Sequence, residues 1–428
     1  MIYTFHLRSV TEIFAGGADI QSAELRPSAF RGPLRFWFRA MMGKVVGNDL
    51  ERLRRLEAAA FGATDSGSPF VLRLAASPQT TDPNTIITPS VGKAYLGFSL
   101  YDRVDDQMRL ARGCIPAGEN FTLSLHFRRP DQKLQDVLLG SLWLLLNFGG
   151  IGSRTRRGFG CIAVRSVELN QEACFNYFSP TKSGPNIQQF YKLGQQLAEK
   201  QFRGFAGDIP GTEVEQIAEY TNFSSWKARL IVRAQSPVGA QAADHWFSLW
   251  GVILRSFRNG TSVAPGQQNA FEKLSCTTSD YRKVMSYLMD GDNPERLFLE
   301  NDVLGLPIVV QSGTRNNLTK TLSWRGPSKE KEGQRASPLV LHPVPLPDGR
   351  LGTLIVFFVS RFLPEGAEIT IQYPSSQPLE TATDADICKT ADQFFEYLKD
   401  IFSPREGNPG DDLLASLPEV TLTTGTGK

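Results

Sequence analysis

The sequence predicts an α+β protein built from two units, each with helices packed on one face of an antiparallel sheet. Two observations carry this prediction. Short segments that alternate apolar and polar residues are interleaved with segments whose apolar residues recur at helical spacing, and most connections between them are short. The chain also has 428 residues, which is more than one average domain. We therefore expect two similar folding units in tandem.

The first unit begins with a strand at residues 2–10, where apolar and polar residues roughly alternate. A helix follows, since Pro33 suits the first turn of a helix and Gly43 its end. Its core-facing stripe has apolar residues at helical spacing, namely Leu34, Trp37, Phe38 and Met41. Further elements are expected as a helix at 49–61, strands at 70–76, 94–102 and 120–128, a largely apolar helix at 131–148 and a strand at 159–167.

This order of elements is typical of a ferredoxin-like (RRM-like) domain, which we place at residues 1–176. Residues 177–225 have weaker apolar periodicity and clusters of Pro, Gly and Gln, so we expect a linker or an insertion there. A second ferredoxin-like domain is expected at 226–402, followed by a flexible tail at 403–428. Within the second domain we expect strands at 227–234, 335–339 and 351–362, helices at 245–257, 279–290 and 386–402, and a polar loop at 312–334.

The composition is that of an ordinary globular protein, with 41% hydrophobic and 21% charged residues. The 46 basic and 44 acidic residues nearly cancel, so nucleic-acid binding would have to rest on local patches. The five cysteines are scattered and lack the spacing of a disulfide framework or a zinc site, and we expect no metal and no cofactor. The N-terminus lacks a signal peptide's apolar region, and no window of about 18 apolar residues could span a bilayer, so a cytoplasmic location is expected.

The most informative stretch is residues 148–160, Phe-Gly-Gly-Ile-Gly-Ser-Arg-Thr-Arg-Arg-Gly-Phe-Gly, which we call the Gly/Arg loop. Its glycines can adopt positive φ angles and present backbone N–H groups, and no acid lies between Phe148 and Arg165. The spacing is neither that of a P-loop nor that of a dinucleotide-binding turn, so mononucleotides are disfavoured. We expect a cradle for an anionic polymer; the alternative is a glycine-rich turn with solvated arginines. The candidate residues are Gly150, Gly152, Ser153, Arg154, Arg156 and Arg157.

A second basic feature is the arginine ridge, which consists of Arg31, Arg35 and Arg39 on the first helix. These arginines recur every four residues and therefore share one face. No acid between Leu25 and Asn48 neutralises them in the sequence. The alternative to a binding surface is a solvated helix face.

Five motifs carry a family resemblance. They are Pro27–Arg39, the helix that ends in Phe61-Gly62, Gly149–Gly160, Leu304-Gly-Leu-Pro-Ile308 and Arg335-Ala-Ser-Pro-Leu339. Together they resemble the RAMP superfamily of CRISPR proteins, and within it the family of first subunits of Cmr (type III-B) effector complexes. The resemblance runs from about residue 3 to residue 362. The Gly/Arg loop alone marks the superfamily, whereas the Arg-Gly-x-Leu-Arg-Phe-Trp-x-Arg helix and Arg-Ala-Ser-Pro-Leu are more specific.

The resemblance implies two ferredoxin-like folds and a place near the end of a ribonucleoprotein complex for antiviral RNA interference. Its implied partners are guide (CRISPR) RNA, target RNA and other Cmr subunits. The arginine ridge and the Gly/Arg loop suit a sugar-phosphate backbone that is read by shape. Three aromatic residues could stack on bases, with burial in the core as the alternative for each: Phe30, Phe36 and Phe159.

We expect a non-catalytic RNA-binding subunit. In the related backbone subunit that cleaves target RNA, an aspartate after the first strand does the metal-dependent work; Asp19 and Glu24 occupy a comparable loop here, without a convincing copy of that motif. The alternatives are a RAMP endoribonuclease that cleaves guide-precursor or target RNA, and a scaffold that contacts no RNA. Metal-independent cleavage could use a histidine, but we expect structural roles for all four: His6, His126, His245 and His342.

Overall fold

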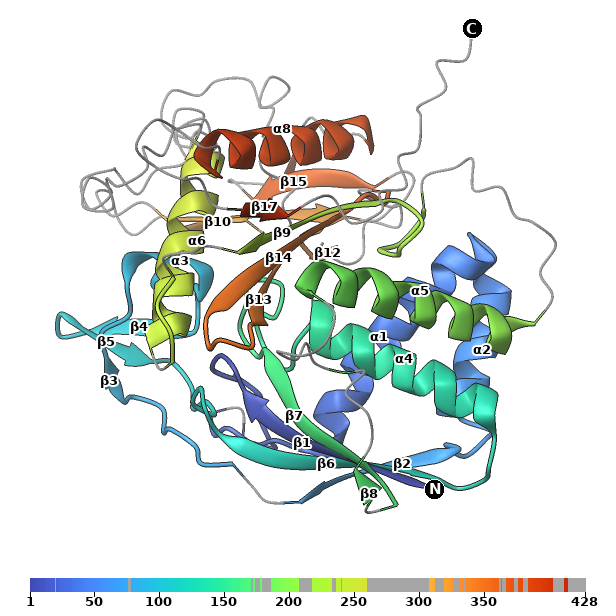
Figure 1. Ribbon diagram of the computed structural model, residues 1–428. Helices are drawn as coiled ribbons and strands as arrows, with labels where there is room; N and C mark the ends of the chain where they lie inside the picture. Colours follow the sequence, from blue (N-terminus) through green and yellow to red (C-terminus); the bar gives the residue numbers. More distant parts are fainter. Residues whose placement is uncertain are drawn as a thin grey trace, which may run out of the picture.

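The computed structural model confirms the α+β fold class, with two ferredoxin-like domains (Figure 1). It describes residues 1–19, 21–75, 78–170, 172–173, 178, 186–207, 218–232, 236–239, 241–259, 308–311, 319–325, 332–333, 336–361, 363, 367–372, 376–379, 384–402 and 412–414. The helix expected at 279–290 lies outside these residues. Within them, no helix is long and apolar enough to cross a membrane.

The first domain has one antiparallel sheet with strand order β2-β6-β1-β7-β8. Along β6 every second residue is buried, which is the period of a strand with one face on a core. Helices α1 and α2 connect β1 to β2, and α4 connects β6 to β7, so the order of α1, α4 and the four strands is ferredoxin-like. Its elements are β1 (Ile2–Ser9), α1 (Pro27–Val46), α2 (Leu50–Phe61), β2 (Phe70–Ala75), β6 (Asn120–Phe127), α4 (Gln132–Phe148), β7 (Ile162–Leu169) and β8 (Glu172–Ala173).

The second domain repeats this topology with strand order β13-β14-β9-β17. One helix follows β9 and another follows β14, as α1 and α4 do in the first domain. The last strand lies in the tail that we expected to be flexible from residue 403, so that expectation does not hold for these three residues. The elements are β9 (Trp226–Val232), α6 (Gln241–Asn259), β13 (Leu339–Pro345), β14 (Leu351–Phe358), α8 (Asp384–Phe402) and β17 (Asp412–Leu414).

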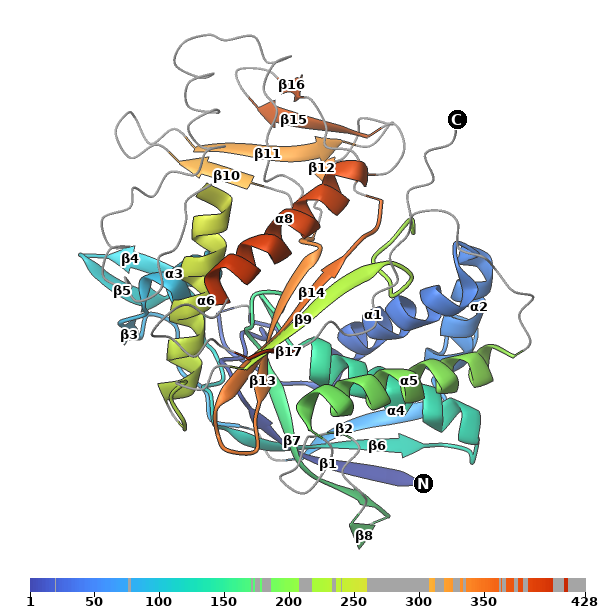
Figure 2. The same ribbon diagram turned by 45° about the horizontal axis from the view of Figure 1, so that its top comes forward.

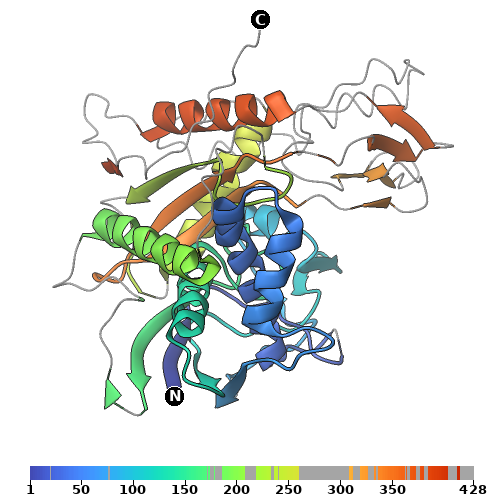
Figure 3. The same ribbon diagram turned by 90° about the vertical axis from the view of Figure 1, so that its right-hand side faces the viewer.

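The second sheet is buried on both faces, as its nearly continuous apolar strands require. Val356 and Phe358 belong to the core shared with the helices of the first domain. Ile355 and Phe357, which point the other way, belong to the core beneath α6 and α8. The layers therefore run sheet, helices, sheet, helices, which is visible from the side in Figure 3.

Two smaller sheets are insertions in this plan (Figure 2). In the first, the strand expected at 94–102 is wrong except at its end, where a strand begins at Tyr101. Ser90 accepts a hydrogen bond from the Lys93 amide and caps a helix over Val91–Leu96. In the second, β11 and β12 lie in the range expected as a loop at 312–334. These elements are β3 (Ile86–Ile87), α3 (Val91–Leu96), β4 (Tyr101–Val104), β5 (Gln107–Leu110), β10 (Ile308–Gln311), β11 (Thr319–Arg325), β12 (Glu332–Gly333), β15 (Glu368–Gln372) and β16 (Ser376–Leu379).

Two further differences concern helices. Helix α1 begins at Pro27, so Pro33 lies inside it and not in its first turn. Helix α5 (Ile187–Ala206) lies in the range expected as a linker or insertion, and it packs on α4 and α1. Its buried face includes Phe190, Tyr191, Ala198 and Phe202 at helical spacing, and the missing side chain of Gly194 leaves room for the Trp143 ring.

Candidate RNA-binding site

The Gly/Arg loop lies where the two domains meet. Towards the first domain, the Ser153 amide donates to the Phe14 carbonyl at 2.9 Å and the Gly160 amide donates to the Glu12 carbonyl at 2.8 Å. Towards the second domain, the Arg156 carbonyl accepts a hydrogen bond of 3.0 Å from the Leu341 amide on β13. The loop is therefore held from both sides by backbone hydrogen bonds.

The glycines of the loop serve close packing. Gly152, Gly158 and Gly160 have φ angles of 91°, 88° and 72°, which confirms the expected positive φ at these positions. A side chain at Gly158 would overlap the Trp246 ring, and one at Gly160 would overlap the Ile151 carbonyl. Gly150 is buried against the Gly160 carbonyl.

The prediction that the loop forms a cradle of free backbone N–H groups is therefore wrong in part. The amides of Ile151, Ser153, Arg157, Gly158 and Gly160 all donate to protein carbonyls, and Gly150 is buried. Gly152 is exposed. The chemistry that this loop can offer to a ligand thus comes mainly from its side chains.

Each of the three loop arginines has a different environment. Arg154 is exposed, has a φ of 59° and donates to Ser99 Oγ at 3.2 Å. Arg156 lies over the Phe36 ring, 5.3 Å from its centroid, and donates to the Ser337 carbonyl. Arg157 lies deepest, and burial together with the positive charge of Arg258 lowers its pKa to about 10.

Two arginines that sequence reasoning missed complete this group. Arg112, beyond β5, adds positive charge beside Arg154. The pKa of Arg154 is lowered because its guanidinium group is partly withdrawn from water and because Arg112 is near. Arg258, in the last turn of α6, acts on Arg157 and donates to the Tyr95 hydroxyl at 3.3 Å. No local pattern marks them, since the fold brings both from distant parts of the chain. We call Arg112, Arg154, Arg156, Arg157 and Arg258 the basic cluster.

The arginine ridge contacts α2 and the residues that follow it. Arg31 donates to the Phe61 carbonyl at 2.9 Å and to Ser68, and Arg35 donates to the Gly62 carbonyl at 3.0 Å. Glu57 on α2 lies 3.7 Å from Arg35 and 3.4 Å from Arg39, so the acid that is missing within 25–48 comes from the next helix. The structure therefore uses Arg31 and Arg35 to dock α2 and the chain that follows it, and leaves Arg39 exposed.

The three aromatic residues considered for base stacking are not free to do so. Phe30 and Phe159 are fully buried, and Phe159 stacks on Phe247 with ring centroids 4.3 Å apart. Phe36 is half-buried beneath Arg156. The alternative that we gave for each, a place in the core or its edge, is the one that the structure shows.

Asp19 has the loop hydrogen-bonding role that sequence analysis gave as the alternative to catalysis. Its carboxylate accepts from the Gln21 amide at 2.9 Å and from Ser22 Oγ at 2.8 Å, and these bonds lower its pKa. The nearby Glu24 lies 3.5 Å from Arg26. Among the described residues, no group of three or more His, Cys, Asp or Glu is placed to hold a metal ion.

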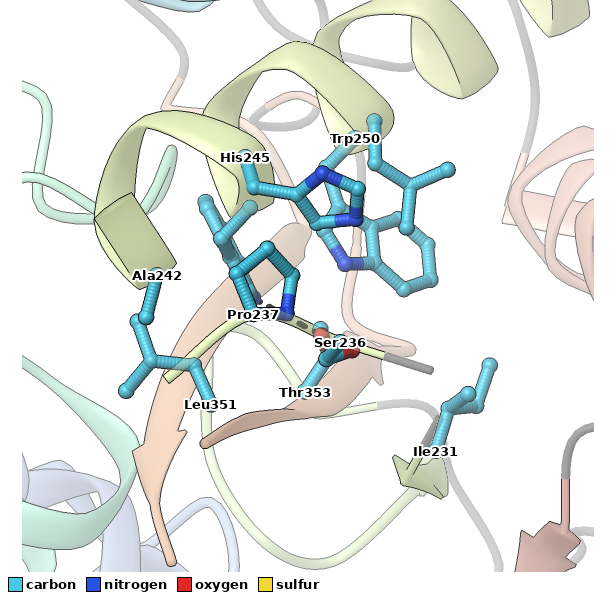
Figure 4. Close-up of a pocket in the computed structure, with 10 residues that line it drawn as sticks. Ile231, Ser236, Pro237, Ala242, His245, Trp250, Leu351 and Thr353 are labelled. Atoms are coloured by element: carbon cyan, nitrogen blue, oxygen red, sulfur yellow. Dashed lines mark hydrogen bonds between the residues drawn. The ribbon is translucent and has the colours of Figure 1, made fainter. Parts of the chain in front are cut away.

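The four histidines lie apart from one another. His6 contacts Glu168 at 3.0 Å. Burial lowers the pKa of His126 and lowers that of His342 to about 3. His245 lines a cavity between α6 and the second sheet with Pro237 and Thr353 (Figure 4). That cavity measures about 10 Å³, enough for about one water molecule.

Comparison with known proteins places this geometry in a family. A model described as the RAMP superfamily matches residues 6–163, a range that contains both α1 and the Gly/Arg loop. The CRISPR system Cmr subunit Cmr1-2 of Pyrococcus furiosus is 30% identical over 181 residues, which are 38% of this chain and 95% of that protein. This chain belongs to the RAMP superfamily.

Within the RAMP superfamily the chain resembles Cmr1 proteins, as expected from its motifs. Cmr1-1 of P. furiosus is 28% identical over 348 residues, which are 80% of this RAMP chain and 82% of that protein. The crystal structure of apo Cmr1 from the same organism covers 85% of this chain and 90% of its own, with a TM-score of 0.50 at 18% identity. That structural likeness shows a shared fold.

Proposed function

We propose that this RAMP protein is a non-catalytic RNA-binding subunit of a type III-B CRISPR (Cmr) effector complex. It would hold guide RNA, target RNA or both near the end of the complex, beside other Cmr subunits, for antiviral RNA interference in the cytoplasm. Its similarity to two curated Cmr subunits supports membership of such a complex. The observation that carries RNA binding is the basic cluster.

Electrostatics favour an anion at this cluster. The pKa values of Arg154 and Arg157 are lowered by burial and by neighbouring guanidinium groups, namely those of Arg112 and Arg258. A phosphate placed there would offset that repulsion, and guanidinium groups bind phosphate with charge-assisted hydrogen bonds. Since phosphates carry no base identity, binding should depend little on RNA sequence.

The ridge residues have a smaller part in this proposal. Arg39 is exposed and therefore accessible to RNA, whereas Arg31 and Arg35 hold α2 in place. Arg156 lies over Phe36, the residue after Arg35 on α1, so the ridge and the basic cluster lie on neighbouring parts of the molecule. We therefore assign the principal phosphate contacts to the Gly/Arg loop.

The test is binding of the full chain to a labelled single-stranded RNA across a salt series, with and without Mg²⁺, followed by a gel of the RNA. We expect salt-sensitive binding of intact RNA, weakened at least tenfold in a variant with Arg154, Arg156 and Arg157 changed to Ala. The matched control is Arg203→Ala, since Arg203 is an exposed arginine on α5 that pairs with Glu199.

Two outcomes would replace the proposal. Cleavage of the RNA that disappears in Asp19→Ala, or in a variant of one histidine, would make the protein a RAMP endoribonuclease. Equal affinity of the triple variant, the control and the unchanged protein would favour a scaffold that contacts no RNA at the basic cluster. Thermal melting of the triple variant checks that it folds.

A further inference from the structure

One aromatic side chain is open to solvent. Phe98, in the turn between α3 and β4, is 54% exposed. Every other Phe, Tyr or Trp whose burial the structure describes is buried or half-buried. Single exposed apolar residues are common on protein surfaces, so the exposure alone carries nothing. What distinguishes Phe98 is where its turn is fixed.

The turn that bears Phe98 is seated on the Gly/Arg loop. Its preceding residue, Gly97, packs so closely on the loop that a Cβ there would lie 2.9 Å from the Phe159 ring. Its following residue, Ser99, has a φ of 74° and accepts the hydrogen bond from Arg154. Phe98 is therefore held by its two neighbours against the loop, one residue from the contact of Arg154, and its own side chain points away from the core.

We propose that Phe98 is a base-stacking residue for single-stranded RNA whose backbone phosphates are bound by Arg154 and Arg112. This inference rests on the function proposed above and adds a specific contact to it. Every base has an aromatic face, so stacking on Phe98 would be tolerant of sequence, as the phosphate contacts are. The positive charge of Arg154, which is hydrogen-bonded to Ser99 beside Phe98, and of the nearby Arg112 favours a nucleic acid over an apolar protein surface as the occupant.

The test measures the affinity of the full chain for single-stranded RNA that carries 2-aminopurine, a base whose fluorescence is quenched by stacking. Phe98→Ala should weaken binding about tenfold and reduce the quenching. Phe98→Trp should retain both, whereas Phe98→Leu, which is apolar but has no ring, should resemble Phe98→Ala. None of these changes removes a charge, so the salt dependence should stay as in the unchanged protein.

The control is Leu193→Ala on α5, because Leu193 is similarly exposed at 56%. It should leave affinity and quenching unchanged. If the unchanged protein binds RNA and Phe98→Ala binds it equally tightly, the stacking inference is wrong while the proposed function stands. If Phe98→Ala instead only weakens co-purification with the other Cmr subunits, Phe98 is a protein contact. Failure of the unchanged protein to bind RNA would overturn both proposals.

Discussion

Arginines that share one face of α1 have different roles in this protein, and the role of each depends on the groups that it contacts. Arg31 donates two hydrogen bonds to groups at the end of α2 and beyond it, whereas Arg39, two turns later on α1, is exposed and lies 3.4 Å from Glu57. The sequence predicted their common face correctly, because that follows from helical periodicity. It could not predict Glu57 or the Phe61 carbonyl as partners, because these lie on another element.

We expect Arg31→Ala to lower the free energy of unfolding by about 1.5–3 kcal/mol, since it leaves the Phe61 carbonyl without this charged donor. Arg39→Ala should change it by less than about 0.5 kcal/mol, as for an exposed ion pair. Urea unfolding of both variants measures the difference. Equal, small effects would mean that Arg31 does not hold α2.

His342 should make stability depend on pH. Burial lowers its pKa in the folded protein to about 3, from an ordinary value of 6.5. Between these values the unfolded chain binds more protons than the folded protein, so stability is lost as the pH falls from 6.5 towards 3, by at most about 1.4 kcal/mol per unit. Unfolding at pH 7 and pH 5 should show a smaller loss for His342→Asn than for the unchanged protein. An identical loss would contradict this assignment.

Among the helices and strands, some of those whose ends are set by a local signal such as a capping residue were predicted from the sequence. Asp131 accepts from the Leu134 amide and starts α4, close to where the sequence placed the helix. Helix α5 was missed although Phe190, Tyr191 and Phe202 on its buried face recur at helical spacing. The glycines of the Gly/Arg loop were recognised in the sequence. The contact of Gly158 with the Trp246 ring could not be predicted, because Trp246 belongs to the other domain and lies far away in the sequence.

Substitution of two glycines should show where a glycine is needed for close packing and where it only makes the chain more flexible. Gly158→Ala should destabilise the protein by several kcal/mol, because the position has a φ of 88° and its side chain would meet Trp246. Gly204→Ala, within α5 and with nothing within 4 Å, should stabilise it by about 0.5–1 kcal/mol. Melting temperatures measure both signs. A neutral Gly158→Ala would show that the loop does not need this close contact.

For the whole molecule, burial of the second sheet on both faces makes the two domains depend on each other. Val340, Val356 and Phe358 share one core with residues of α1 and α4. The sequence predicted two ferredoxin-like domains from the order of elements, yet nothing local in it indicates which helices cover the outer face of a sheet. The same contact between domains assembles the basic cluster, since Arg258 comes from the second domain and Arg112 and Arg154 from the first.

We expect the sheets of the two domains to unfold together, in one cooperative transition of the full chain. A fragment starting at residue 218 should aggregate or bind a dye that reports exposed apolar surface, because its sheet would lose the helices that cover Val356 and Phe358. Expression of this fragment beside the full chain makes the comparison. A soluble, monomeric fragment that binds no dye would show that the domains are independent.

If the basic cluster binds RNA phosphates as one site, RNA binding must depend on salt through its arginines. The logarithm of affinity should fall linearly with the logarithm of salt concentration, with a slope that loses about 0.7 per phosphate contact removed from single-stranded RNA. For Arg112→Ala with Arg154→Ala we predict weaker binding to every RNA sequence and a slope reduced by about 1.4, with no change for Arg203→Ala. A slope equal to that of the unchanged protein would contradict the claim.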